Sequence, residues 1–276
     1  MSAPLRNRRI DLRKTLFLLP NLITLSSIFC GFDSIRISAR AQSDDDFYRA
    51  SILLVFALLF DMLDGRVARL TKTQSAFGLQ IDSLADAISF GVAPALLVYQ
   101  WSLHQVGTLG VVCSFLFCGA GAVRLARFNV LSMGESGAPT KPGKYVVGLV
   151  IPGAAGILVS LILANHAVGG DLHSLKYAYP LCGLTVFLSF LMVSTIKFRS
   201  FKDLKWSART VALILFVVGS SAVISVQTKP AFVLVWLLSC YVLIGIVEAV
   251  VTFPRRRREA KAARDAEHTA EQPPSK

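Results

Sequence analysis

The sequence predicts an all-α membrane protein, a polytopic bundle of about eight transmembrane helices, from three observations. Hydrophobic residues make up 54% of the 276 residues, and only 17% are charged. The mean hydropathy is +0.58, whereas a water-soluble domain needs more polar surface to cover its core. The apolar residues also gather in windows of about 20, the length of a helix that crosses a bilayer. Most of the 29 Lys and Arg residues lie between these windows, so the net charge of +12 does not indicate nucleic-acid binding.

Eight windows are apolar enough to be spans. They lie approximately at residues 15–34, 49–70, 79–101, 106–128, 144–165, 177–196, 208–227 and 231–253. Together they predict one transmembrane domain over residues 15–253. Residues 1–14 are basic and partly apolar, which suits either an interfacial segment on anionic lipids or an ordinary basic flank of the first span. Residues 254–276 are expected to form a basic disordered tail on the same side of the membrane as residues 1–14.

The basic residues between the spans indicate the orientation. With both termini on one side of the membrane, 24 of the 29 Lys and Arg residues fall on that side. Basic loops stay in the cytoplasm, so we expect both termini to be cytoplasmic. A bacterial inner membrane is the expected location.

Four acidic residues interrupt the second and third spans, although ionisable groups inside a membrane are costly and commonly functional. Asp61 and Asp64 stand three positions apart, and Asp82 and Asp86 stand four apart, so each pair shares one face of its helix. A short connection joins the two spans, which makes them antiparallel neighbours. The acidic faces are therefore expected to oppose each other towards the cytoplasmic side.

Two opposed acidic faces would repel each other without positive charge between them. Two divalent cations, Mg²⁺ or Mn²⁺, meet this requirement, because hard oxygen ligands suit them and a metal pair can clamp a pyrophosphate. Gly65, Ala68 and Gly78 leave room for a ligand, and Arg69 is placed to pair with a phosphate oxygen. The alternative is that Lys and Arg residues on neighbouring helices neutralise the carboxylates.

The acidic and small residues form one pattern, Asp61-x2-Asp64-Gly65-x2-Ala68-Arg69-x8-Gly78-x3-Asp82-x3-Asp86. This pattern resembles the signature of the CDP-alcohol phosphatidyltransferases. The resemblance implies a membrane enzyme that moves a phosphatidyl group from a CDP-linked lipid to an alcohol and releases CMP. It implies that all four aspartates belong to the metal site and that Asp86 is also the catalytic general base.

The resemblance further implies that the small residues accommodate cytidine and that Arg69 touches phosphate. Asn21 and Thr24, polar residues of the first span, are placed to reach the nucleotide, with helix-packing hydrogen bonds as the alternative. The residues expected to bind CDP-diacylglycerol are thus Asn21, Thr24, Gly65, Ala68, Arg69 and Gly78.

Further stretches resemble the bacterial phosphatidylserine synthase branch of the family, which implies L-serine as the acceptor and a homodimer. These stretches are residues 20–24, 30–31, 89–94, 124–129, 148–155, 192–194 and 201–202. One departure is Val150, which stands where the family commonly has a proline. It changes backbone rigidity at that point and bears on the shape of the acceptor pocket.

A serine acceptor needs a cation for its carboxylate. Arg124 and Arg127 lie one turn apart at the end of the fourth span, with Asn129 and Lys144 after them. We expect these four residues to bind serine, the alternative for each being a cytoplasmic anchor of its helix. Two other functions stay open: the same chemistry with glycerol phosphate, inositol phosphate or choline, and an ion-coupled transporter that uses the acidic cluster as a relay.

Overall fold

The computed structural model describes residues 12–71, 73, 75–132, 145–199, 220–221, 232–240 and 242–244. Apart from one pair of short strands, the elements between residues 12 and 199 are helices. They are α1 (Leu12–Ser38), α2 (Asp44–Leu70), α3 (Ala76–Asp86), the π-helix η1 (Ala87–Val92), α4 (Ala93–Trp101), the 3₁₀-helix η2 (Leu103–Val106), α5 (Thr108–Ser132), β1 (Tyr145–Val147), α6 (Ile151–Val168), α7 (Leu175–Val193) and β2 (Lys197–Arg199).

The predicted helical membrane fold is confirmed. Four helical segments of the described chain are long and apolar enough to cross a membrane: Ala76–Trp101, Thr108–Leu131, Ile151–Val168 and Leu175–Val193. The helices α1 and α2 coincide with the predicted spans 15–34 and 49–70 but carry more charged residues. The total of eight spans stays a prediction. The window 208–227 lies almost entirely outside the described residues, and the window 231–253 is described only at residues 232–240 and 242–244, which are helical. The tail and most of the segment 1–14 also lie outside the described residues.

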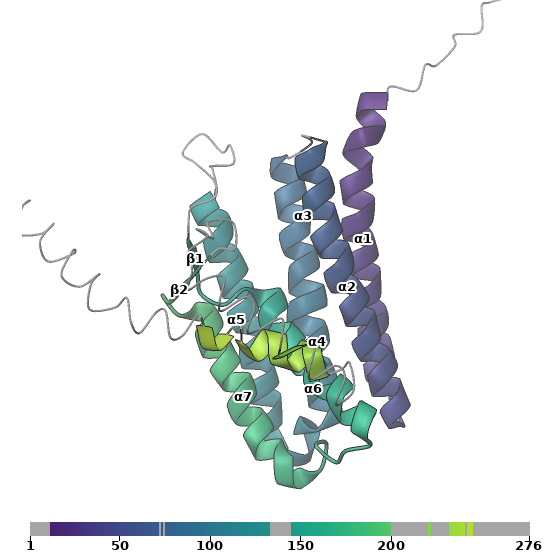
Figure 1. Ribbon diagram of the computed structural model, residues 1–276, viewed down its shortest axis with the longest axis vertical. Coiled ribbons are helices and arrows are strands. Elements are labelled where there is room, and N and C mark those ends of the chain that lie inside the picture. Colours follow the sequence, from purple (N-terminus) through teal and green to yellow (C-terminus); the bar gives the residue numbers. More distant parts are fainter. Residues whose placement is uncertain are drawn as a thin grey trace, which may run out of the picture.

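Three helices, α1, α2 and α3, run side by side along one edge of the molecule (Figure 1). Small residues allow α1 and α2 to approach closely, since Ala50 and Ala57 are fully buried between them. Serine hydroxyls of α1 donate to backbone carbonyls of α2: Ser27 Oγ lies 3.1 Å from Ala57 O, and Ser34 Oγ lies 2.9 Å from Ala50 O. The pair is therefore held both by packing and by polar contacts.

The π-helix η1 continues α3 and begins directly after Asp86. π-helical turns are rare and occur frequently at functional sites. Here Ser89 of η1 donates a hydrogen bond of 3.0 Å to Ser27 O of α1. Gly31 faces the same serine, and a Cβ added at Gly31 would lie 2.6 Å from Ser89 Oγ. The turn that follows Asp86 is thus seated against α1 where only a glycine fits.

The predicted span 144–165 begins later than expected, at Ile151. The reason is that residues 145–147 form strand β1, which pairs antiparallel with β2 and draws the chain out of the helix. Gly148 then turns the chain with a positive φ of 79°. Val150 has a φ of −68°, the value that a proline ring imposes. The φ of Val150 is therefore one that a proline at this position could also adopt.

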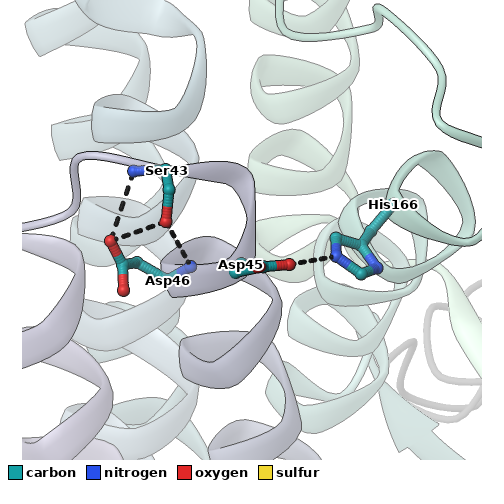
Figure 2. A network of polar contacts seen from close by, with 4 residues as sticks. All are labelled: Ser43, Asp45, Asp46 and His166. Atoms are coloured by element: carbon teal, nitrogen blue, oxygen red, sulfur yellow. Dashed lines mark hydrogen bonds and ion pairs between the residues drawn. The ribbon is translucent and has the colours of Figure 1, made fainter.

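A capping box starts α2 at its N-terminus (Figure 2), at the opposite end of the helix from Asp61 and Asp64. Ser43 Oγ accepts from the Asp46 N–H, and Asp46 Oδ2 accepts from the backbone N–H groups of Gln42 and Ser43. The Gln42 N–H and the Ser43 hydroxyl hold the pKa of the Asp46 carboxyl below its usual range. Asp45 Oδ1 lies 2.9 Å from His166 Nε2, so the start of α2 is also tied to α6.

Candidate active site

Helices α2 and α3 bring three carboxylates together. One carboxylate oxygen each from Asp61, Asp64 and Asp82 lies within 4.8 Å of the other two. Asp64 is buried, and Asp61 and Asp82 are half-buried. The spacing within each helix places its acids on one face, and the antiparallel pairing turns the two faces towards each other. The structure therefore brings together the acidic faces that the sequence placed on separate helices.

Asp86 lies one helical turn beyond Asp82, deeper in the bundle. Its carboxyl is beside that of Asp61 and interacts electrostatically with Asp82 and Arg124. The Oδ1 atom of Asp86 is buried and has no hydrogen-bond partner among the residues that the structure describes. A buried carboxylate oxygen without a partner is costly, so this atom is placed to meet a bound ligand or a substrate proton.

The donor set fits divalent cations. All four candidate ligands are carboxylates, the hard oxygen donors that Mg²⁺ and Mn²⁺ prefer. Three of them converge, and the fourth presents the unpartnered Oδ1. The residues present could therefore hold the metals that the sequence predicts.

The first-span residues Asn21 and Thr24 differ in burial and in their contacts. Asn21 is half-buried near the start of α1. Thr24 is buried, and its hydroxyl lies 2.6 Å from Oδ2 of Asp64. Of the two residues assigned to the nucleotide, Thr24 thus contacts one of the clustered carboxylates.

The small residues of the motif lie around the aspartates. The Arg69 side chain folds back over Gly65, since a Cβ at Gly65 would lie 3.5 Å from Arg69 Nη1. Gly78 sits in the first turn of α3, where its N–H donates to Ser75 Oγ at 3.0 Å. Ala68 is half-buried on the same helix as Gly65. The exposed Arg69 guanidinium therefore lies beside Gly65 and close enough to Asp64 to interact with it electrostatically.

Two candidate serine-binding arginines of α5 have different surroundings. Arg124 is buried, with 8% of its surface exposed, and its guanidinium lies 5.6 Å from the centre of the Phe128 ring. It interacts electrostatically with Asp86. Arg127 is exposed, and its Nη1 donates to Val193 O at the end of α7 at 3.4 Å. Only Arg124 thus reaches the acidic cluster, whereas Arg127 meets the carbonyl end of a helix, which favours a cation.

Asn129 is bound by residues of α3 that the sequence analysis missed. Ser83 Oγ lies 3.0 Å from Asn129 Oδ1, and Asn129 Nδ2 lies 3.4 Å from Gln80 Oε1. Ser83 and Gln80 are polar residues close to Asp82 in an otherwise apolar window. Their polarity is the feature of the sequence that could have indicated a role at the site. Lys144, the remaining serine-site candidate, lies outside the described residues.

Comparison with known proteins places this geometry in context. The family model described as CDP-alcohol phosphatidyltransferase matches residues 17–191. This range contains the four aspartates, the small residues beside them and both arginines of α5.

Three relatives carry related names. A Helicobacter pylori (strain J99) CDP-diacylglycerol–serine O-phosphatidyltransferase is 38% identical over 235 residues, which cover 84% of this chain and 91% of that protein. The enzyme of the same name from Methanocaldococcus jannaschii is 31% identical over 199 residues, covering 72% and 83%. An archaetidylserine synthase of Methanothermobacter thermautotrophicus is 37% identical over 188 residues, covering 65% and 69%.

Proposed function

The chain belongs to the CDP-alcohol phosphatidyltransferase family, and from this premise we propose that it transfers the phosphatidyl group of CDP-diacylglycerol to L-serine, giving phosphatidylserine and CMP. The observation that carries the proposal is the meeting of Asp61, Asp64 and Asp82 from two helices. The acceptor follows from the relatives, whose names specify serine.

Asp61, Asp64, Asp82 and Asp86 would hold two divalent cations, Mg²⁺ or Mn²⁺. When bound, such a pair supplies positive charge that clamps the pyrophosphate and stabilises the charge that develops in an in-line displacement. Each of the two helices contributes two of these carboxylates. The described arginines near them are fewer than the acids and so do not balance their charge, which supports the assignment of bound cations.

The residues around the aspartates bind the nucleotide end of the lipid. Arg69 pairs with a phosphate oxygen, since a guanidinium matches two oxygens at once. Gly65, Ala68 and Gly78 leave space for cytidine, and Asn21 lies on α1 one turn before Thr24, whose hydroxyl contacts Asp64. The diacylglycerol chains stay in the lipid, so CDP-diacylglycerol enters sideways from the inner leaflet.

Arg124 and Asp86 serve the acceptor. The guanidinium of Arg124 binds the serine carboxylate, and its electrostatic contact with Asp86 supports placing both groups at one end of a small substrate. Asp86 takes the proton of the serine hydroxyl at Oδ1. The serine oxygen then forms its bond to the phosphorus linked to diacylglycerol, while the phosphorus–oxygen bond to CMP breaks. Positioning and electrostatics carry most of the rate enhancement.

The test is CMP release by the purified full-length protein with CDP-diacylglycerol and Mn²⁺ or Mg²⁺. We expect L-serine to stimulate release, and glycerol phosphate, inositol phosphate and choline to have no effect. Stimulation by one of these other acceptors would contradict the serine assignment but retain the family chemistry. Absence of CMP release with every acceptor would contradict the proposed function itself.

A further inference from the structure

One polar contact joins α1 to the acidic cluster across 40 residues of sequence. The hydroxyl of Thr24 lies 2.6 Å from Oδ2 of Asp64. Both residues are buried, with 4% of each exposed. Buried contacts to a carboxylate are short and strong because the acceptor is charged and little water competes.

The same hydroxyl lies 3.0 Å from the carbonyl oxygen of Pro20, one turn earlier in α1. A threonine hydroxyl has one proton to donate. An ionised carboxylate is a stronger acceptor than a peptide carbonyl and stands at the shorter distance. The proton therefore points at Asp64, so the hydroxyl donates within the protein.

The position of Thr24 itself is fixed by its helix. Ser27, one turn further along α1, binds Ala57 O through its hydroxyl and accepts from Ser89 through its carbonyl oxygen. These bonds hold α1 against both α2 and the π-helix that follows Asp86. The backbone that carries Thr24 is therefore fixed relative to α2, which carries Asp64, and to the π-helix that continues α3.

We propose that Thr24 is a positioning residue, which fixes the rotamer of Asp64 by holding Oδ2 and so directs the carboxylate towards Asp61 and Asp82. It acts on metal affinity through Asp64 and does not contact cytidine. The proposal rests on the proposed function only in taking the aspartates as the metal site. Loss of a hydrogen bond that orients a metal-binding side chain commonly lowers metal affinity about 10–100-fold.

The experiment compares three variants of the full-length protein in nanodiscs. Thr24→Val keeps the shape of the side chain and removes the hydroxyl, whereas Thr24→Ser keeps the hydroxyl. Ser26→Ala is the matched control, because within the part of the chain that the structure describes the Ser26 hydroxyl donates to Leu22 O of its own helix. Free Mn²⁺ is measured by electron paramagnetic resonance without substrate, and KM for CDP-diacylglycerol is measured at saturating Mn²⁺.

We expect Thr24→Val to weaken Mn²⁺ binding about 10–100-fold, and Thr24→Ser and Ser26→Ala to bind Mn²⁺ as the parent protein does. Saturating Mn²⁺ should restore the KM of Thr24→Val. Unchanged Mn²⁺ affinity in Thr24→Val, equal loss in Thr24→Ser, or a raised KM that Mn²⁺ does not restore would overturn the proposal. A parent protein that binds Mn²⁺ but releases no CMP would contradict the proposed function alone.

Discussion

At the scale of single residues, Asp86 differs from the other three aspartates in its surroundings. Asp61, Asp64 and Asp82 converge on one another, and Asp64 is held by Thr24. Asp86 instead has Arg124 nearby and an oxygen without a hydrogen-bond partner among the described residues. This combination suits a residue that receives a proton from a substrate bound at Arg124.

Replacement of Asp86 by Asn should abolish serine-dependent CMP release, by a factor of about 100 or more, while the protein stays folded. The amide keeps the shape of the side chain but cannot take the hydroxyl proton. Asp33→Asn is the control, since Asp33 pairs with Arg36 at the other end of α1 and should leave turnover unchanged. Full activity in Asp86→Asn would contradict the assignment of the general base.

Replacement of Arg124 by Ala should raise the serine KM by roughly 10–100-fold, the effect of losing a charge-assisted hydrogen bond. Arg127→Ala should change the serine KM much less, because Arg127 contacts the Val193 carbonyl. Steady-state kinetics with varied serine at saturating CDP-diacylglycerol distinguish the two. An unchanged serine KM in Arg124→Ala would show that another group binds the carboxylate.

The sequence predicted the acidic cluster well because its members are close in sequence and regular in spacing. Positions three and four apart share a helix face whatever the tertiary structure. The partner of Thr24 was not predictable in this way, because Asp64 lies 40 residues away and the contact depends on how α1 packs against α2. For the same reason the spacing of the two arginines did not show that Arg124 and Arg127 have different partners. The partner of Arg127, Val193, lies 66 residues away in the sequence.

At the scale of elements, the π-helix η1 is the feature that seats Asp86. The turn after Asp86 is bound to α1 through Ser89 and packs against Gly31. The apolar pattern of residues 79–101 predicts a continuous helix, and it contains no signal for a π-helical turn. Its presence follows from tertiary contacts with α1, which propensity alone does not determine.

Replacement of Gly31 by Ala should displace η1, because the new Cβ would lie 2.8 Å from Ser89 Cα as well as near its hydroxyl. We expect a loss of about 1–3 kcal/mol in stability, as for other overpacked interiors, and lower turnover. Thermal unfolding in detergent and CMP release measure the two effects. Gly183→Ala is the control, since no atom lies within 4 Å of a Cβ there; equal behaviour of the two variants would contradict the seating of η1 by Gly31.

At the scale of the whole molecule, acidic and basic residues are distributed differently between the two ends of the helices. The α2–α3 connection lies at the same end as the start of α1 (Figure 1), and Asp61, Asp64 and Asp82 belong to the parts of α2 and α3 next to that connection. The α1–α2 connection lies at the other end, next to the acidic run Asp44–Asp46 in the first turn of α2. In the topology predicted from the sequence, the basic residues concentrate on the side of these three aspartates, so we propose that serine arrives from the cytoplasm.

Cysteine labelling in intact cells checks this orientation. A membrane-impermeant maleimide should label Gln42→Cys, in the exposed α1–α2 connection, and should label Ala76→Cys, at the exposed start of α3, only after the membrane is opened. The parent chain, with its five cysteines, gives the background. The reverse pattern would place the active site outside and contradict the positive-inside assignment.

The central claim is that two helices hold divalent cations between their acidic faces, and Mn²⁺ binding to the purified protein tests it most directly. Equilibrium titration, with free Mn²⁺ measured by electron paramagnetic resonance, should show two bound ions per chain in the parent protein. The double variant Asp61→Asn, Asp82→Asn removes one ligand from each helix and should lose this binding, while its thermal unfolding remains cooperative. Mn²⁺ binding of equal stoichiometry and affinity in that folded variant would contradict the claim.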